Sequence, residues 1–191
     1  MSRANQSSSS PPEGYPHELE RRVEAESGVT LRIRPVLPTD AERLGEEIHN
    51  ADAQTLYMRF FTPTVHLDAA RLRYLTEVDY VHRLALVVFV DDDGTEGEGV
   101  AIARYEGKPD SGVAEIAVTV KENWRQAGLG KMLVRLLESA AVDRGITAFE
   151  AMYLGGNEGA AGLMQSAGFE VDQVEAGVVT VSKTLGPVDA A

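Results

Sequence analysis

The stretch GVAEIAVTVKENWRQAGLGKMLVRLLESAAVDRG, residues 112–145, joins a strand pattern directly to a helix pattern. Apolar residues recur at every second position from 114 to 120, which is the period of a β-strand and places Glu115 on the opposite, more polar face. After a polar turn, apolar residues recur at three- and four-residue spacings over 129–141, as on one face of an α-helix. Gly145 then supplies the glycine that commonly follows a helix. The sequence therefore predicts a strand–turn–helix unit.

The turn of this unit has the features of a phosphate-binding site. A helix that begins directly after a strand presents unpaired backbone N–H groups at the positive end of its dipole. Gly128 and Gly130 have no Cβ, so a pyrophosphate can approach the main chain closely, and Arg125 and Lys131 add positive charge. Two nucleotide motifs do not fit. A Walker loop needs Gly at position 125 and Ser or Thr at 132, and a dinucleotide fingerprint needs a small residue at 133.

A third motif fits the turn. The run Arg125-Gln-Ala-Gly128-Leu-Gly130 matches the acetyl-CoA pattern Gln/Arg-x-x-Gly-x-Gly/Ala, so the chain resembles the GNAT superfamily of N-acetyltransferases. The segment from Asn157 to Phe169 is similar to a second pattern of that family, Asn-x-x-Ala-x-x-Leu-Tyr-x-x-x-Gly-Phe. The resemblance covers residues 29–185. The strand at 114–120 looks most like that of bacterial protein lysine acetyltransferases of the actinobacterial type.

The resemblance implies an α/β (α+β) fold of the GNAT type. The expected architecture is a mixed central sheet of six to seven strands, with splayed central parallel strands, flanked by about four helices. The chain would then divide into a disordered or loosely helical tail over 1–27, the GNAT domain over 28–186 and a short disordered end over 187–191. The strand patterns lie near 29–34, 83–91, 99–105, 114–120, 148–154, 169–174 and 178–182, and helical patterns begin near 40, 53, 68, 129 and 157.

The resemblance also implies where acetyl-CoA binds as co-substrate. Pantetheine would lie between the splayed strands and pair with the main chain of 118–120, while the pyrophosphate would take N–H groups of the turn. Asn157 would face the pantetheine arm, although a helix N-cap explains this residue equally well. At positions 126 and 127 the family frequently has glycine and a cation. This chain has Gln126 and Ala127 instead, and this departure would weaken coenzyme binding modestly. The residues expected to bind the coenzyme are Val118, Thr119, Val120, Arg125, Gln126, Ala127, Gly128, Leu129, Gly130, Lys131 and Asn157.

Acetyl transfer to an amine needs a proton acceptor, because a lysine amine has a reference pKa of about 10.4. Glu115 is the candidate general base, acting directly or through water. A carboxylate in a partly buried strand is costly unless it has a role. The resemblance supports this choice, since the run Ala114-Glu-Ile-Ala-Val-Thr-Val resembles the strand that supplies the glutamate of the lysine acetyltransferases. The alternative is a solvent-facing residue that pairs with Arg104 or another cation of a neighbouring strand.

One departure concerns the general acid. Many GNAT enzymes have a tyrosine where this chain has Met164, so the residue that protonates the leaving thiolate is not identified. A thiol has a reference pKa of about 8.5, low enough for the thiolate to leave without a dedicated acid. The favoured function is acetyl transfer to a primary amine, with a protein lysine preferred. The alternatives are a small-amine acetyltransferase and an inert module that binds acyl-CoA, and Met164 supports the latter.

The acceptor cannot be identified from the sequence. The cluster Tyr57-Met-Arg59-Phe-Phe61 borders the acceptor groove in GNAT-like proteins, which makes Arg59 and Phe61 candidates, although core packing explains the aromatic residues more simply. The four histidines show no ligand spacing, so no metal site is expected. His82 precedes an apolar strand and is interpreted as a boundary residue rather than a base.

Composition is consistent with one soluble domain. The 191 residues, of which 43% are hydrophobic, suffice for one sizeable core. The chain has no cysteine, which excludes disulfides, a cysteine nucleophile and thiolate zinc sites. A net charge of −12 disfavours nucleic-acid binding and suits a cationic acceptor. The apolar run 84–90 is too short to cross a bilayer, so we expect no membrane partner and a cytoplasmic location. A monomer and a dimer are both compatible with the sequence.

Overall fold

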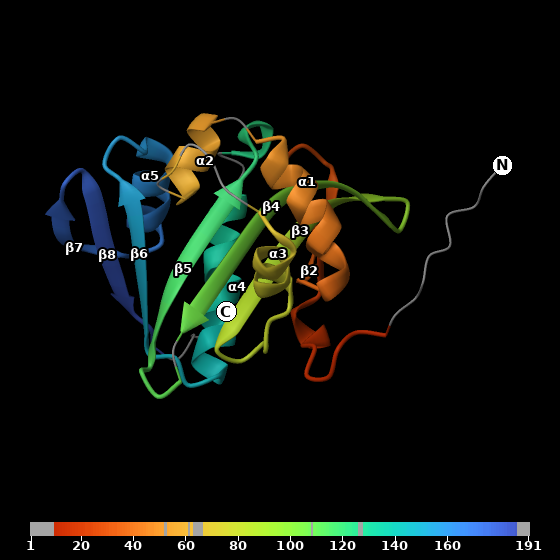
Figure 1. Ribbon diagram of the computed structural model, residues 1–191, viewed down its shortest axis with the longest axis horizontal. Coiled ribbons are helices and arrows are strands. Elements are labelled where there is room, and N and C mark those ends of the chain that lie inside the picture. Colours follow the sequence, from red (N-terminus) through yellow and green to blue (C-terminus); the bar gives the residue numbers. More distant parts are fainter. Residues whose placement is uncertain are drawn as a thin grey trace.

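The fold is a mixed α/β sheet structure (Figure 1). The computed structural model describes residues 10–51, 53–60, 62, 67–107, 109–125 and 128–186. In these residues the chain forms one eight-stranded sheet of order β1-β2-β3-β4-β5-β6-β8-β7. The strands are β1 (Arg21–Glu24), β2 (Thr30–Pro35), β3 (Arg83–Asp92), β4 (Thr95–Gly107), β5 (Val113–Val120), β6 (Ala148–Leu154), β7 (Glu170–Glu175) and β8 (Val178–Thr184).

Helices lie on both faces of the sheet (Figure 1). Within the described ranges they are α1 (Ala41–His49), α2 (Ala53–Phe60), α3 (Ala69–Thr76), α4 (Leu129–Asp143) and α5 (Glu158–Ser166), with short 3₁₀ turns η1 (His17–Leu19), η2 (Pro38–Asp40) and η3 (Glu122–Trp124). The fold predicted from the sequence is confirmed, although the sheet has eight strands rather than six to seven. No helix in the described part of the chain is long and apolar enough to span a membrane.

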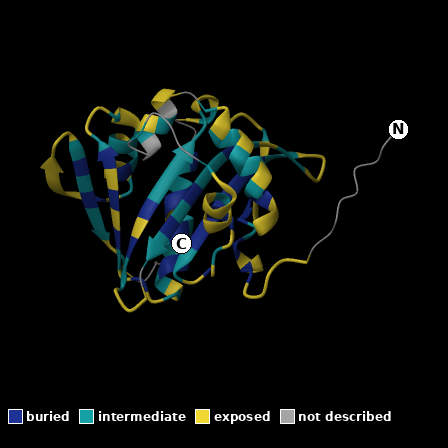
Figure 2. Cartoon of the chain, in the orientation of Figure 1, coloured by how far each residue is buried: buried dark blue, intermediate teal, exposed yellow. Residues whose placement is uncertain are grey.

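The main core lies between the sheet and α4. The α4 residues Leu133, Val134 and Leu137 are fully buried, as the three- and four-residue spacing of the sequence requires. They pack with buried residues of the central strands, including Ile116 and Phe149. Figure 2 shows this burial concentrated in the central strands, whereas β7 at the sheet edge is exposed along its whole length. The central strands are therefore held rigidly from one side by α4.

The two central parallel strands separate along their length. Within β5 and β6, pairing is confined to three positions, Val113↔Ala148, Ala114↔Phe149 and Glu115↔Glu150. Beyond these pairs, β5 continues to Val120 and β6 continues to Leu154, and Figure 1 shows the two strands diverging. The predicted splaying of the central parallel strands is therefore confirmed.

The N-terminal segment differs from the expected tail. Tyr15 and Leu19 are buried at 8% exposure each, and the Tyr15 ring packs edge-on against Tyr80 with ring centroids 5.6 Å apart. The charged segment that follows forms β1 and pairs with β2, from Arg21↔Ile33 to Glu24↔Thr30. Residues 15–24 therefore belong to the folded structure, and residues 21–24 of the expected loose helix form an edge strand. The expected ends at 1–9 and 187–191 lie outside the described residues.

This packing predicts that the N-terminal segment stabilises the domain. We expect Tyr15→Ala to lower the free energy of unfolding by about 2–4 kcal/mol, because it removes a buried aromatic ring and leaves a cavity against Tyr80. Urea unfolding followed by circular dichroism measures the loss. Glu13→Ala, at an exposed position of the same segment, should change the stability by less than about 0.5 kcal/mol. Equal effects of the two variants would show that the segment contributes no packing energy.

Candidate active site

The turn after β5 combines a left-handed residue with a helix start. β5 ends at Val120, η3 follows, and α4 begins at Leu129. Gly128, immediately before α4, has φ = +71°, a conformation that residues with a Cβ adopt at a cost. Apart from its chain neighbours, no described residue has an atom within 4 Å of the position that a Cβ on Gly128 would occupy, so the backbone conformation rather than crowding selects glycine here. Gln126 and Ala127 lie outside the described residues.

The N-terminus of α4 is open for an anion. Among the described residues, no side chain caps this helix end and no acidic residue lies in its first turn. The first N–H groups of any helix have no intrahelical acceptor, and here no side-chain cap occupies them. The helix dipole favours negative charge beside them. Arg125 is exposed next to this end, where its Nε donates to the Val120 carbonyl oxygen at 3.3 Å, and Lys131 is half-buried in the first turn. These features are those of a phosphate site.

Gly130 has a packing role that the sequence did not reveal. A Cβ on Gly130 would lie 3.3 Å from both terminal carbons of Leu163 on α5. The glycine therefore permits close contact between α4 and α5, whereas the sequence suggested only close approach of a phosphate. The two glycines of the turn thus serve different purposes, one conformational and one steric.

The left-handed conformation of Gly128 predicts that alanine is tolerated less well there than at a glycine inside a helix. We expect Gly128→Ala to lower the free energy of unfolding by about 1–2 kcal/mol, since alanine is strained at positive φ, and to weaken acetyl-CoA binding by disturbing the turn. Gly162→Ala is the control, because Gly162 lies in α5 and its Cβ position has no described atom within 4 Å beyond its chain neighbours and the backbone of its own helix. Alanine there should raise stability by up to about 1 kcal/mol. Calorimetric titration and urea unfolding provide the two readouts, and unchanged binding by Gly128→Ala would contradict the assignment of the turn.

Asn157 lies on the opposite rim of the opening, between β6 and α5. Its Oδ1 accepts a hydrogen bond from the Ala160 N–H at 3.1 Å, and its own N–H donates to the Leu154 carbonyl oxygen at 2.7 Å. Asn157 is therefore the N-cap of α5, as one of the two interpretations expected. The cap uses only the amide oxygen, so the amide N–H₂ group is compatible with the second interpretation, contact with the pantetheine arm.

Lys121 is a residue of the turn that sequence reasoning missed. Its ammonium lies 2.9 Å from a carboxylate oxygen of Glu47 on α1 and 3.0 Å from Glu98 on β4. Burial alone would lower the pKa of Lys121, but the hydrogen bonds to both carboxylates outweigh it and raise the pKa. Lys121 therefore stays charged and ties the end of β5 to two other elements.

Glu115 lies on the face of the sheet that carries α1, α2 and α3. It is exposed, which corrects the expectation of a partly buried carboxylate. Its cross-strand neighbours are Glu106 on β4 and Glu150 on β6. Directly opposite residues of adjacent strands share one face, so the three carboxylates form a row across the sheet. Within the described part of the chain, no ion pair within 4 Å joins Glu115 to a cation. Arg104 donates to the Leu75 carbonyl oxygen at 2.6 Å.

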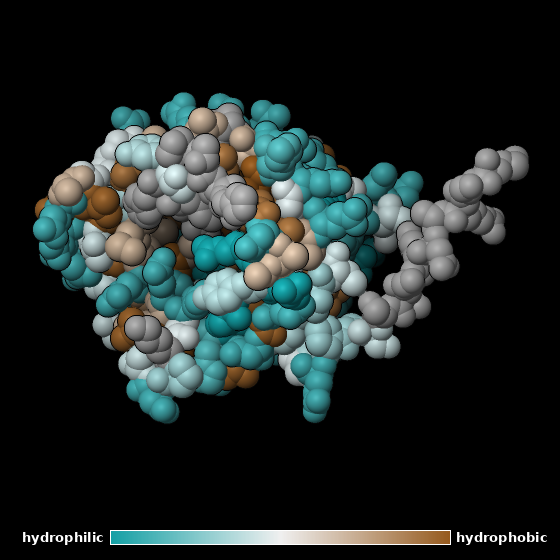
Figure 3. Space-filling model, in the orientation of Figure 1, coloured by the Kyte–Doolittle hydropathy of each residue, from teal (hydrophilic) through white to brown (hydrophobic). Residues whose placement is uncertain are grey.

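The row lies where the two parallel strands begin to separate. Figure 3 shows a hollow with hydrophobic residues on its rim on this face, at the place where β5 and β6 diverge in Figure 1. The open end of the gap points to the phosphate turn, and the closed end carries Glu115 and Glu150. A ligand whose phosphate sits at α4 and whose arm runs between the strands would therefore end beside Glu115.

Met164 and His82, two other candidate residues, do not add to the site. Met164 is 6% exposed and packs in the main core, so a thioether takes the place where many GNAT enzymes have a tyrosine. His82 is a half-exposed boundary residue before β3, with Nδ1 3.6 Å from Asp79. The Arg59 side chain and Phe61 lie outside what the structure describes. Among the described residues, no group of three or more metal-ligating side chains could hold a metal ion.

Comparison with known proteins decides the family. The model of the Acetyltransferase (GNAT) family matches residues 48–169, well over half of the chain. The chain belongs to this family. Members of the GNAT family use acetyl-CoA, and the open helix end and the splayed strands of this domain are compatible with that co-substrate. Two curated relatives that match this chain are both named acetyltransferases.

Individual GNAT relatives extend the comparison. Acetyltransferase Pat of Mycolicibacterium smegmatis is 33% identical over 172 residues, which cover 87% of this chain and 49% of the relative. The chain thus spans about half the length of that protein. Acetyltransferase PA5475 of Pseudomonas aeruginosa is 32% identical over 128 residues, 67% of each protein. The crystal structure of the GNAT domain of S. lividans PAT superimposes with a TM-score of 0.80 at 29% identity, covering 90% of this chain and 99% of that domain.

Proposed function

We propose that this GNAT domain transfers the acetyl group of acetyl-CoA to a primary amine, preferably a protein lysine, with Glu115 as the general base. The observation that carries the proposal is the end of the β5–β6 ladder at Glu115 and Glu150. Pantetheine lying in the gap and pairing with the main chain of residues 118–120 has its phosphate end at α4 and its thioester end near Glu115. Asn157 and the turn residues Arg125, Gly128 and Lys131 would complete the coenzyme site.

The reaction would proceed by direct attack. The amine nitrogen of the acceptor bonds to the thioester carbonyl carbon, the carbon–sulfur bond breaks, and the coenzyme leaves as a thiolate. The acceptor nitrogen arrives as an ammonium group and loses two protons. Glu115 takes the first, directly or through one water, which frees the amine for attack, and passes it to solvent, to which it is exposed; the second leaves by the same route as the amide forms. Solvent can also protonate the thiolate, whose reference pKa of about 8.5 makes it a tolerable leaving group without help from Met164.

The charge distribution supports a cationic acceptor. Free lysine side chains are protonated at neutral pH, and Glu106, Glu115 and Glu150 would attract an ammonium group to the closed end of the gap. The net charge of −12 adds a long-range attraction. The resemblance of the strand at 114–120 to that of bacterial protein lysine acetyltransferases favours a protein acceptor over a small amine. Buried Met164 is the observation that favours the alternative, an inert acyl-CoA-binding module.

Glu115→Gln tests the base. We expect turnover to fall by roughly 10²–10⁴-fold, which is the typical contribution of a general base, with acetyl-CoA affinity unchanged. The measurements are thiol release from acetyl-CoA with a panel of lysine-containing proteins and small amines, and calorimetric titration of the coenzyme. Glu175→Gln removes the same charge at an exposed position of β7 and should leave both readouts unchanged.

The same assays separate the alternatives. Acceptor-dependent turnover by the wild-type protein with proteins but not small amines supports the lysine acceptor, and the reverse supports the small-amine enzyme. Coenzyme binding without turnover on any acceptor supports the inert module. Full activity of Glu115→Gln would remove this residue from the mechanism.

A further inference from the structure

β7 is an edge strand whose outer side has no partner in the described part of the chain. It is the last strand of the sheet, and among the described strands it pairs with β8 alone. An edge strand presents a row of backbone N–H and carbonyl groups to which another extended chain can bind. All six residues of β7 are exposed, as Figure 2 shows. The edge is therefore accessible to an additional strand.

A β-bulge places the two valines of β7 on one face of the sheet. The register shifts by one residue between Val171 and Gln173. Val171 lies opposite buried Val181. Val174 lies opposite buried Val179, so both valines of β7 share the apolar face of β8. Without the bulge, their three-residue spacing would place them on opposite faces. β7 thus continues the apolar face of the sheet to its edge.

These two valines are the most exposed large apolar side chains of the described chain. Val171 is 61% exposed and Val174 is 67% exposed. Each has a cross-strand neighbour on the β8 side, whereas no described strand lies on the other side. A further strand beside β7 would supply the missing cross-strand neighbours.

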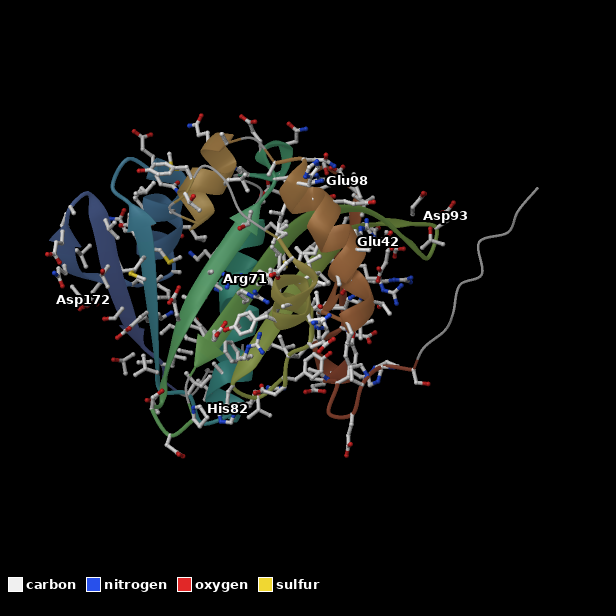
Figure 4. All side chains as sticks on the ribbon, in the orientation of Figure 1. Glu42, Arg71, His82, Asp93, Glu98 and Asp172 are labelled. Atoms are coloured by element: carbon white, nitrogen blue, oxygen red, sulfur yellow. The ribbon has the colours of Figure 1, made fainter. Side chains whose placement is uncertain are left out.

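The carboxylates of β7 lie on the opposite face. Glu170 lies opposite Ser182, and Glu175 lies opposite Val178. Asp172, in the bulge, accepts a hydrogen bond from the Ser182 hydroxyl at 2.9 Å, and Figure 4 shows it at this edge of the molecule. No ion pair within 4 Å joins any of the three carboxylates to a cation of the described chain. The edge therefore combines an acidic face with an apolar face.

Charge selects among the possible occupants of this edge. Two copies of the chain that paired their β7 strands about a twofold axis perpendicular to the sheet would bring the acidic faces together, and like charges oppose such pairing. The net charge of −12 adds to the repulsion between copies. A strand in which lysine or arginine alternates with apolar residues would complement both faces, because alternate side chains point to opposite faces. Charge complementarity therefore favours a basic segment over a second copy.

We propose that the outer edge of β7 is a docking site for an extended basic segment of another protein, which binds as an additional strand of the sheet. The basic side chains of this segment lie beside Glu170, Asp172 and Glu175, and its alternate apolar side chains pack on Val171 and Val174. The edge is separated from the β5–β6 gap by β6 and β8. The inference is therefore independent of the proposed acetyl transfer, and its test needs no turnover.

The probe is a capped octapeptide in which arginine and valine alternate, because arginine lacks the amine that acetyl transfer requires. Binding is followed by fluorescence anisotropy of the labelled peptide and by ¹⁵N amide spectra of the full chain. We expect the largest amide shifts, and slower hydrogen exchange, within residues 170–175. A peptide with four arginines followed by four valines should bind at least about fivefold more weakly, since it cannot complement both faces.

Two double variants separate docking from general charge attraction. Glu170→Gln with Asp172→Asn should weaken binding of the alternating peptide about three- to tenfold, the effect of losing two cross-strand charge pairs. Asp92→Asn with Asp93→Asn removes the same charge at exposed positions of the β3–β4 hairpin, whose Asp93 lies on the other side of the molecule from Asp172 (Figure 4). This control should change the affinity by less than about twofold, because salt screens charges at such distances.

Val171→Thr with Val174→Thr tests the apolar face at constant charge. Threonine suits an exposed strand, so the fold should persist while the affinity for the peptide falls about threefold or more. The inference would be overturned by unshifted β7 amides at peptide saturation, by equal losses in the two charge variants, or by equal binding of the two peptides. A wild-type dimer in sedimentation with β7 amides protected before peptide is added would also overturn it, since a second copy would then be the occupant.

Discussion

The parallel ladder between β5 and β6 ends at Glu115 and Glu150, and the rest of the site depends on this limit. In a continuous parallel sheet, the main chain of residues 116–120 would be paired with β6 and closed to any ligand. Because the strands separate, the main chain of β5 beyond Glu115 is not paired with β6 in the part of the chain that the structure describes. An extended ligand can pair with such an edge as an additional strand. The phosphate turn lies at the open end of the gap and the carboxylates lie at its closed end, so one feature of the backbone orders the whole site.

The separation persists because each strand is fully paired on its outer side. β5 pairs with β4 from Gly107↔Ala114 to Ala101↔Val120, and β6 pairs with β8 over its entire length. At the closed end, the small side chain of Ala114 lies beside Phe149, whose ring centroid is 5.8 Å from that of Tyr105 on β4. At the open end, Gly130 lets α5 approach α4. The closed end is thus tightly packed, whereas at the open end each strand keeps its pairing with its outer neighbour, β4 or β8.

Much of this arrangement could be predicted from the sequence, because two-residue and three-to-four-residue periodicities mark strands and helices locally. β1 was missed because it is a charged edge strand whose pattern also suits an exposed helix. The exposure of Glu115 was missed for another reason. The alternation of apolar and polar residues tells which face of the strand a residue is on. It does not tell that α1 and α3 lie over β2 to β4 and leave Glu115 on β5 uncovered (Figure 1). The register that sets Glu106 against Glu115 depends on the geometry of the β4–β5 turn, which one sequence does not determine.

The exposure of Glu115 changes how such a site would work. A buried carboxylate gains basicity from desolvation but needs a path for the proton to leave. An exposed carboxylate exchanges its proton directly with water. Solvent access would also remove the need for a dedicated acid where Met164 stands in place of the tyrosine. The open carboxylate row and the apolar residue at 164 are therefore consistent with each other, since both assign the transfer of protons to water.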